Sequence, residues 1–428
     1  MAIPSKQSCG TERASVDKTG GSCPESVARS GLSPGSSSCR QKVVFFDGSS
    51  AEARLRPAIH LNCDLVPSFF ETWQRIMMID LTRSTTASPL VHAVSIDPGT
   101  DWVSDSVAID AAPDNDIDPS ADAQWPEDSA RSGLCGAVGP RIVALPDGGY
   151  RMYYTQILPR AGFPAGANDY GNCTSRILSA ASRDAVNWIP ERGVRLSPQA
   201  GGAGDFRVVS SEVVPMADNS GRLRMYYECC DGPQSAQNSI RSAVSSDGLI
   251  WNVEDGERFQ LTGQNISAPR IQFLDDGRCR LYCSERSRGI ISAVSDDGLT
   301  FAPEPGIRIA PDGPFDRLTA FAPEILRLPS GGYRMYYAGY SEPQQADVLT
   351  ATSDDGLNWK KATEPVLSPG GSAWNAAKCS EMCVVWNTDR QTSDLNFRMF
   401  YEACDGTAAD KRGVWRIAGA TGSESLIH

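Results

Sequence analysis

Five charged residues occupy the same place in five repeats of the sequence, and they are the side chains best suited to do chemistry. Aligning the repeats puts Arg141, Glu212, Arg270, Glu324 and Glu381 at one register. Neighbouring carboxyl groups shift one another's pKa values, so three glutamates together can supply one protonated acid and one ionised base. The same alternation of Glu and Arg is also compatible with a purely structural ring of ion pairs.

Histidine is scarce, which limits the other kinds of chemistry. The chain contains three His residues, His60, His92 and His428, and none lies within the repeats. A Ser-His-Asp centre, a Cys-His centre or a zinc site with His ligands is therefore not expected there. Any chemistry must come from carboxylates, Arg, Lys, Tyr or Cys.

Two aspartates on the loops that lead into the repeats offer further carboxylates. Asp205 is followed by Arg207 and Asp316 by Arg317, so each aspartate could instead fix its loop through a salt bridge. We expect these four residues, with Arg141 and Arg270, to contact a substrate. The arginines in particular could bind an anionic group. We expect two further glutamates, at matching places in YYECCDG and FYEACDG, to lie farther from the centre: Glu228 and Glu402.

The elements that position these residues are repeated hairpins. One unit is a strand, a tight turn and a second strand that ends in an aromatic pair, as in RMYY. It spans residues 140–155, 211–228, 269–284 and 323–338, and it returns with a longer turn at 380–406. The turns PDGG, DNSG, DDG and PSGG supply the Asp, Asn and Gly residues that a hairpin needs.

A second unit follows each of the first four hairpins. It spans residues 179–188, 242–251, 292–301 and 350–359, and each copy ends in one large aromatic residue. We expect these aromatic residues to fill the wedge between neighbouring sheets. They are Trp188, Trp251, Phe301 and Trp359. A role in stacking on a sugar is the alternative.

Two hairpins per repeat form a four-stranded antiparallel sheet, and five such sheets arranged radially form a five-bladed β-propeller. We predict this all-β fold for residues 91–428. The expected blades cover residues 138–205, 206–264, 265–318, 319–374 and 375–422. The last blade lacks its outer strand, and residues 92–105 echo the second unit, so we predict that this segment closes the ring.

The motifs resemble those of the five-bladed propeller glycoside hydrolases, the arabinanase, invertase and levansucrase group. The resemblance covers about residues 92–420 and rests on the (A/S)P start of the first strand, on RMYY and on the S-x-D-G-x-x-W turn. It implies catalysis by carboxylates on the inner strands. In that group the first blade supplies an Asp, whereas this chain has Arg141 at the matching place.

Glycosidic cleavage requires one protonated carboxylic acid and a second carboxylate as base or nucleophile. Our first hypothesis is therefore a glycoside hydrolase-like enzyme, with Glu212 as the acid and Glu324 or Glu381 as its partner. A catalytically silent propeller that binds a carbohydrate or a protein through the same face is the alternative. An enzyme of another class on the same fold is a third possibility.

Charge and composition restrict the partners. The net charge is −12, and residues 1–90 hold 10 Lys and Arg against 8 Asp and Glu, so the remainder carries −14. An anionic partner such as nucleic acid is not expected. No run approaches the roughly 18 apolar residues of a membrane span, and no secretory signal is recognisable. We expect a cytoplasmic or organellar protein with 13 Cys residues, at least one of them unpaired.

Residues 1–90 are expected to be a mostly disordered extension, with a helix near 67–81. No cofactor is expected. Alternating acidic residues at 114–122 resemble a calcium loop, but Pro119 and Trp125 stand where such a loop needs Gly and Glu. A solvated acidic linker is the interpretation we favour for this segment.

Overall fold

A computed structural model describes residues 97–110, 136–145, 148–159, 173–198, 204, 206–218, 220–232, 237–328, 331–388, 395–406 and 414–422. The predicted extension, its helix near 67–81, the acidic segment 114–122 and Asp205 all lie outside these residues. The described chain is almost entirely β-structure, as predicted, and its one named helix is the 3₁₀ turn η2 (Ala373–Asn375).

The strands pair into antiparallel groups of four. The first three groups are β2 (Gly136–Ala144), β3 (Tyr150–Pro159), β4 (Cys173–Ser182) and β5 (Ile189–Pro190); β6 (Arg207–Pro215), β7 (Leu223–Cys230), β8 (Asn238–Ser245) and β9 (Asn252–Val253); and β10 (Ile266–Phe273), β11 (Cys279–Glu285), β12 (Gly289–Ser295) and β13 (Ala302–Pro303). Within each group the strands follow one another in chain order, so each connection is a hairpin.

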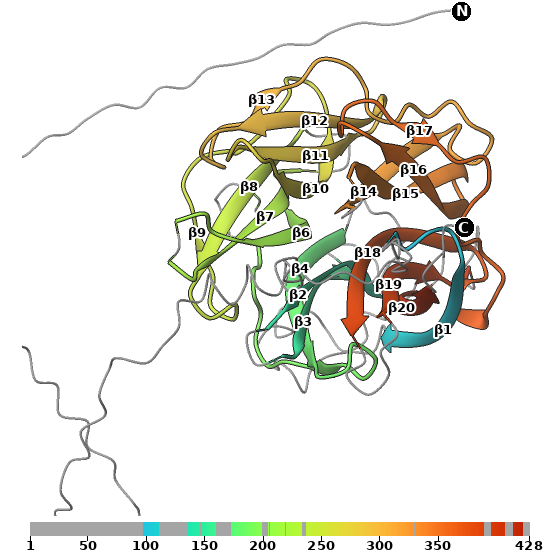
Figure 1. The fold of residues 1–428 in the computed structure, drawn as a ribbon. Coiled ribbons are helices and arrows are strands. Elements are labelled where there is room, and N and C mark those ends of the chain that lie inside the picture. The colour runs from blue at the N-terminus through green and yellow to red at the C-terminus, as the bar shows by residue number, and fades with distance from the viewer. Residues whose placement is uncertain are drawn as a thin grey trace, which may run out of the picture. The chain divides into compact units, whose positions relative to one another are not determined.

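The later strands form two more such groups. They are β14 (Thr319–Arg327), β15 (Tyr333–Glu342), β16 (Gln345–Ser353) and β17 (Lys360–Lys361); and β18 (Lys378–Thr388), β19 (Leu395–Cys404), β20 (Trp415–Gly422) and β1 (Trp102–Ile109). Single parallel bridges, Ala346 to Lys378 and Gly136 to Trp415, join these two groups and the first into one twelve-stranded sheet. Figure 1 shows the groups arranged around a common centre.

The turn between the third and fourth strands is held by one aspartate. The Oδ1 atom of Asp247 accepts hydrogen bonds from the backbone N–H groups of Leu249 (2.8 Å) and Ile250 (2.9 Å). Ser245 also binds this carboxylate and the N–H of Gly248. The carboxylates of Asp184, Asp297 and Asp355 make the same contacts, so the S-x-D motif is a local turn-forming device.

Large aromatic residues at the ends of these turns pack between neighbouring groups. Each makes an edge-to-face contact with a ring of the adjacent second strand, with centroids 5.4 to 6.2 Å apart. The pairs are Tyr153–Trp251, Tyr226–Phe301, Tyr282–Trp359, Tyr336–Trp102 and Phe400–Trp188. Taken in order, they run from the first group through the fifth and back to the first.

Strand β1 pairs with β20 although more than 300 residues separate them. The pairing runs antiparallel from Trp102 opposite Gly422 to Ile109 opposite Ile417. The segment predicted to close the ring was 92–105, whereas the strand found here is Trp102–Ile109. Its Asp105 forms an ion pair with Arg398, with Nη1 and Oδ2 2.7 Å apart.

Candidate functional site

The inner strands carry β-bulges that determine which side chains point inward. In β2, β6, β10 and β14 the ladder skips two residues, and the first of them has a positive φ: Gly139 (60°), Ser210 (46°), Ala268 (50°) and Ala322 (51°). Three of these are not glycine, so the backbone is held there at some cost in energy.

Four predicted ring residues follow these bulges and share one register. Arg141, Glu212, Arg270 and Glu324 each pair with the first tyrosine of the repeated aromatic motif. In this respect the alignment of the repeats was correct.

The fifth inner strand differs, and the predicted register of Glu381 was wrong. In β18 the ladder skips a single residue, Glu381, between the pairs Ser380–Glu402 and Met382–Tyr401. Phe400, which replaces the tyrosine, pairs with Cys383. The ring therefore contains the Cys383 thiol, with Sγ 3.8 Å from Arg141 Nη1, and Glu381 lies two residues closer to the start of the strand.

Arg141 connects two glutamates of the ring. Its Nε atom lies 2.7 Å from Glu212 Oε2, and its Nη2 atom donates to Glu212 Oε1 at 3.0 Å. Its Nη1 atom donates to both oxygens of Glu324, at 3.2 and 3.1 Å. Arg270 Nε also reaches Glu324 Oε2 at 3.1 Å. Two glutamates and two arginines thus neutralise one another.

The ring is also closed to solvent. The side chains of Glu212, Glu324 and Arg270 are 0%, 2% and 3% exposed, and that of Arg141 is 19% exposed. Burial raises the pKa of Glu212 to about 7, although Arg141 and Arg270 favour its ionised form. Backbone N–H groups of Ile271 and Val384 donate to Glu212 and Glu324 at 3.3 and 3.2 Å. The oxygens of both glutamates are thus engaged by the protein itself.

Glu381 has a different environment. It is a buried residue that forms no ion pair with any residue the structure describes. Its Oε2 atom accepts a hydrogen bond from Ser210 Oγ at 3.1 Å. A side chain added at Gly139 would come within 3.4 Å of that oxygen. Burial raises the pKa of Glu381 to about 7; Arg270 opposes the rise and Glu228 adds to it.

Glu402 lies near the end of the second strand of its group, β19, and its carboxyl is next to that of Glu381. Its Oε1 atom accepts the N–H of Gly139 at 2.8 Å, and its Oε2 atom accepts Ser380 Oγ at 2.8 Å. Burial and the neighbouring Glu381 raise the pKa of Glu402 above its ordinary range. The two carboxyls therefore titrate as a pair, in which the first proton is lost more readily than the second.

Glu228 is the third buried carboxyl of this cluster. Asn238 Nδ2 donates to its Oε1 atom at 2.6 Å, and burial raises its pKa while Arg207 opposes the rise. Arg207 itself is fully buried, with its guanidinium 5.0 Å from the ring of Phe206. Of the predicted substrate contacts, Arg207 is thus adjacent to a carboxyl of the cluster.

Asp316 and Arg317 are engaged elsewhere. Asp316 is fully buried, with Oδ2 2.5 Å from Lys361 Nζ and Oδ1 accepting the N–H of Gly313 at 2.7 Å. Arg317 is exposed and pairs with Glu342. Both residues are therefore in ion pairs, as the alternative had it, but with Lys361 and Glu342 rather than with each other.

Sequence reasoning named Glu402 only as a residue farther from the centre, and it did not place Cys383 or Ser210 at the site. For Glu402 a signal existed, because the strand FYEACDG carries an acid at the place where YYECCDG carries Glu228. Cys383 and Ser210 gave none, since a cysteine or serine in a buried strand is ordinarily a small packing residue. Burial, Glu324 and Arg141 together leave the Cys383 thiol with a pKa of about 12, so it is not a nucleophile.

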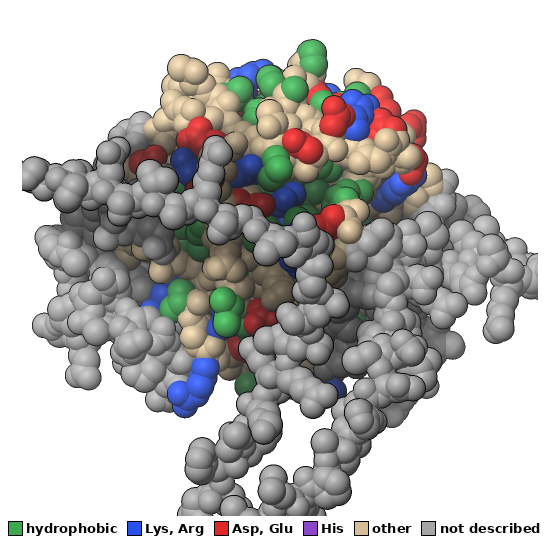
Figure 2. Space-filling view, turned by 90° about the vertical axis from the view of Figure 1, so that its left-hand side faces the viewer, with side chains coloured by type: hydrophobic (Ala, Val, Ile, Leu, Met, Phe, Trp, Pro, Cys, Tyr) green, Lys and Arg blue, Asp and Glu red, His purple; other side chains and the backbone are tan. Residues whose placement is uncertain are grey.

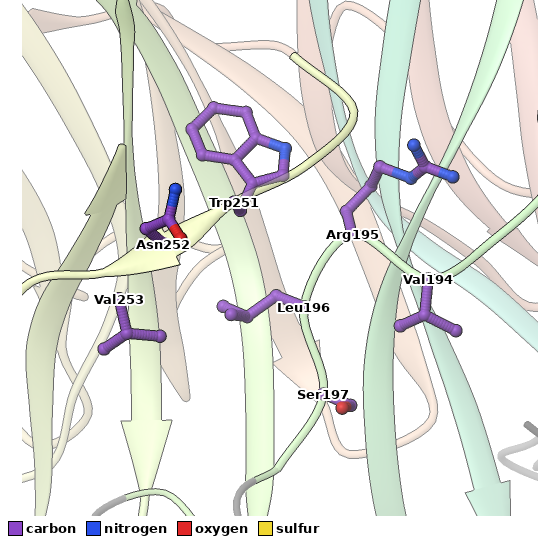
Figure 3. Close-up of a pocket in the computed structure, with 7 residues that line it drawn as sticks. All are labelled: Val194, Arg195, Leu196, Ser197, Trp251, Asn252 and Val253. Carbon is purple, nitrogen blue, oxygen red and sulfur yellow. The ribbon is translucent and has the colours of Figure 1, made fainter. Parts of the chain in front are cut away.

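A separate groove lies on the outside, between the first two groups (Figure 3). It has a volume of about 440 Å³ and is lined by Val194, Arg195, Leu196, Ser197, Trp251, Asn252 and Val253. It contains one charged side chain and none of the carboxyls above. It therefore offers no acid and base pair.

The described residues show no group of three or more His, Cys, Asp or Glu side chains arranged to hold a metal ion. Nor do they include a helix long and apolar enough to cross a bilayer. On the face shown in Figure 2, acidic and basic side chains of the described residues are interspersed.

Comparison with known proteins shows that the fold of this chain is similar to that of several solved structures. No family model and no curated protein matches the chain. A thermostable family-43 glycoside hydrolase superposes with a TM-score of 0.53 at 17% identity, over 66% of this chain and 88% of that one. A second structure superposes with a TM-score of 0.50 at 16% identity, over 67% of this chain and 84% of that one. Its description reads: the GH130 family of mannoside phosphorylases contains glycoside hydrolases that target β-1,2 mannosidic linkages in Candida mannan.

An N-acetylgalactosamine deacetylase from F. plautii, in complex with blood group B trisaccharide, gives a TM-score of 0.54 at 17% identity, over 76% of this chain and 96% of that one. Families 43 and 130 are five-bladed β-propeller families. The fold of this chain thus resembles that of the β-propeller glycoside hydrolases, as the motifs predicted.

Proposed function

We propose that this chain is a five-bladed β-propeller that cleaves a glycosidic bond with the carboxyl pair Glu381 and Glu402. The propeller corresponds to residues 91–428 of the sequence, and its substrate is a carbohydrate. The blade count is supported by the edge-to-face aromatic contacts, which pass through five four-stranded groups and return to the first. A ring of four or six blades would not close through these pairs.

One observation carries the catalytic assignment: Glu381, near the start of the inner strand β18, and Glu402, near the end of β19, are adjacent buried carboxyls. Neither takes part in the ring of ion pairs formed by Arg141, Glu212, Arg270 and Glu324. A pair of this kind holds one proton near neutral pH. The backbone N–H of Gly139 can only donate, so it favours the ionised form of Glu402. The proton is then carried by Glu381, whose partner Ser210 has a hydroxyl that can donate or accept.

In the proposed reaction Glu381 protonates the leaving oxygen of the glycosidic bond. Glu402 supplies the second carboxylate, which activates a water molecule or stabilises the positive charge that develops on the sugar ring. Glu212 and Glu324 are poorer candidates than we expected, because Arg141 and Arg270 already bind their oxygens. We assign these four residues to the floor of the site, beneath the reacting pair.

The test is a hydrolysis assay of the full chain against a library of aryl and natural glycosides. Wild type, Glu381→Gln and Glu402→Gln are compared with the matched control Glu364→Gln, which changes an exposed glutamate. We expect both pair variants to lose at least about 100-fold in kcat and the control to lose nothing. Activity that persists in both pair variants would refute the assignment.

Binding of a carbohydrate without cleavage is the second candidate. It is favoured by Arg141, which neutralises the ring at the place where the resemblance to the propeller glycoside hydrolases implied an Asp. A glycan array read in parallel separates the two: binding by wild type with no hydrolysis of any library member supports the silent propeller. The deacetylase among the similar structures shows that this fold also supports other reactions on sugars.

A further inference from the structure

Lys378 begins strand β18 and is a buried cation. Its Nζ atom lies 5.2 Å from the centre of the Trp415 ring and 5.8 Å from that of Tyr340. Only 7% of the residue is exposed. An ammonium group between two aromatic faces keeps its charge, because the electron-rich faces replace part of its lost hydration.

The strand register brings this cation close to Glu402. Lys378 pairs with Cys404, and Ser380 pairs with Glu402. Alternate residues of a strand share a face, so Lys378 lies diagonally across the ladder from Glu402, within reach of a long side chain. Both side chains are buried, so the attraction between them is weakly screened.

We propose that Lys378 is a positioning residue that stabilises the ionised form of Glu402 and thereby allows the Glu381–Glu402 pair to release a proton near neutral pH. This inference rests on the proposed function only for its consequence in catalysis. The electrostatic contact itself concerns residues of the chain and can be tested without a substrate.

The other titratable groups around Glu402 favour its neutral form or leave it unaffected. Glu381, on the neighbouring strand β18, repels its charge, and Glu402 in turn adds to the effect of burial in raising the pKa of Tyr340 on β15. The thiol of Cys404 is held neutral by burial. Lys378 opposes the repulsion from Glu381, and the N–H of Gly139 and the hydroxyl of Ser380 assist it. Loss of the lysine charge should therefore keep both carboxyls protonated to higher pH.

The experiment is a titration of the full chain labelled with ¹³C at the glutamate carboxyl groups and followed by NMR. Comparison with Glu381→Gln and Glu402→Gln assigns the two signals. Wild type is then compared with Lys378→Met, which keeps much of the volume and removes the charge, and with Lys378→Arg, which keeps the charge. We expect the pH midpoint of the first deprotonation of the pair to rise by about one unit or more in Lys378→Met. In Lys378→Arg this midpoint should stay at its wild-type value.

Circular dichroism verifies that each variant is folded before titration. If Lys378→Met does not fold, Lys378→Gln carries the same test with a polar end group. An unchanged titration in a folded neutral variant would overturn the inference, even if wild type is an active glycosidase. A shifted titration supports it even where no glycoside is cleaved, so the two proposals fail separately. With an active enzyme, the acidic limb of the pH–kcat profile should move by the same amount.

Discussion

The phenolic oxygen of Tyr336 donates a hydrogen bond to the carbonyl oxygen of Gly99 at 2.7 Å, across 237 residues of sequence. Tyr153, Tyr226 and Tyr282 make the same bond to Gly248, Gly298 and Gly356 in the next group along the chain. The segment before β1 thus receives the contact that each group otherwise makes to its successor. This hydrogen bond completes the cycle of contacts between successive groups, and it joins residues from distant parts of the sequence.

Replacing Tyr336 by Phe should destabilise the protein by about 1 kcal/mol, because the buried Gly99 carbonyl loses its donor. Urea denaturation followed by circular dichroism measures this change. Tyr153→Phe is the matched control, since it removes the equivalent bond to Gly248 (2.8 Å), and it should cost a similar amount. A Tyr336→Phe variant as stable as wild type would show that the closing contact contributes nothing.

Removing Arg141 should be far more damaging than removing an exposed arginine. Arg141→Met leaves Glu212 and Glu324 buried with Arg270 as their remaining ring cation, and we expect a loss of about 3 kcal/mol or more. The double variant Arg141→Met, Glu212→Gln should recover part of this loss. The exposed pair of Arg222 with Asp218 provides the control, and Arg222→Met should change stability little. Equal effects at Arg141 and Arg222 would contradict the ring.

Glu381 should make the protein less stable as the pH rises. Its pKa is raised from 4.5 to about 7 by burial, so the folded state binds a proton more tightly than the unfolded state. The stabilisation is complete below about pH 4.5 and is lost as the pH passes through about 7. The urea midpoints of wild type and Glu381→Gln, measured between pH 4.5 and 7.5, should therefore converge or cross as wild type weakens. Parallel curves would exclude the raised pKa.

Activity should depend on Glu381 more than on Glu212. The ring holds Glu212 by two bonds to Arg141, whereas Glu381 is bonded to the single hydroxyl of Ser210. On any glycoside that the wild type cleaves, Glu381→Gln should reduce kcat by about 100-fold or more, and Glu212→Gln should retain most of it once folded. The reverse order of kcat values would restore Glu212 as the acid, as the sequence alone suggested.

The buried thiols should be unreactive in the native protein. Cys229, Cys230, Cys279, Cys283, Cys379, Cys383 and Cys404 are free and buried. Burial raises the pKa of Cys229 and Cys279 to about 11, so little thiolate is present at neutral pH. N-ethylmaleimide labelling followed by peptide mass spectrometry should modify these residues only after urea unfolding. Rapid labelling of Cys383 in the folded protein would show that the ring is open.

Much of the fold could be predicted because its determinants are local. The Asp and Ser side chains of each S-x-D turn bind backbone atoms within three residues, so the motif is sufficient to specify the turn. The aromatic residue that follows each turn, such as Trp251, is large and regularly spaced, which predicted its packing between sheets. A segment near β1 was predicted to close the ring because its sequence resembles the same motif. The predicted segment was 92–105, whereas the strand spans Trp102–Ile109.

The site was predictable only in part. The sequence by itself determined the strands, the turns and the four ring residues that follow a bulge, because similar neighbours impose the same register in each repeat. Tertiary structure alone decided that Glu381 lies within the bulge of β18, at the place that Gly139 has in β2, which puts Cys383 into the ring and Glu381 beside Glu402. The reason is that a bulge depends on how one strand matches its partner, and one residue more or less changes which side chain faces inward. The pairing of β18 with β19 also buries the carboxyls of Glu381 and Glu402 side by side, and this shared burial determines their protonation states.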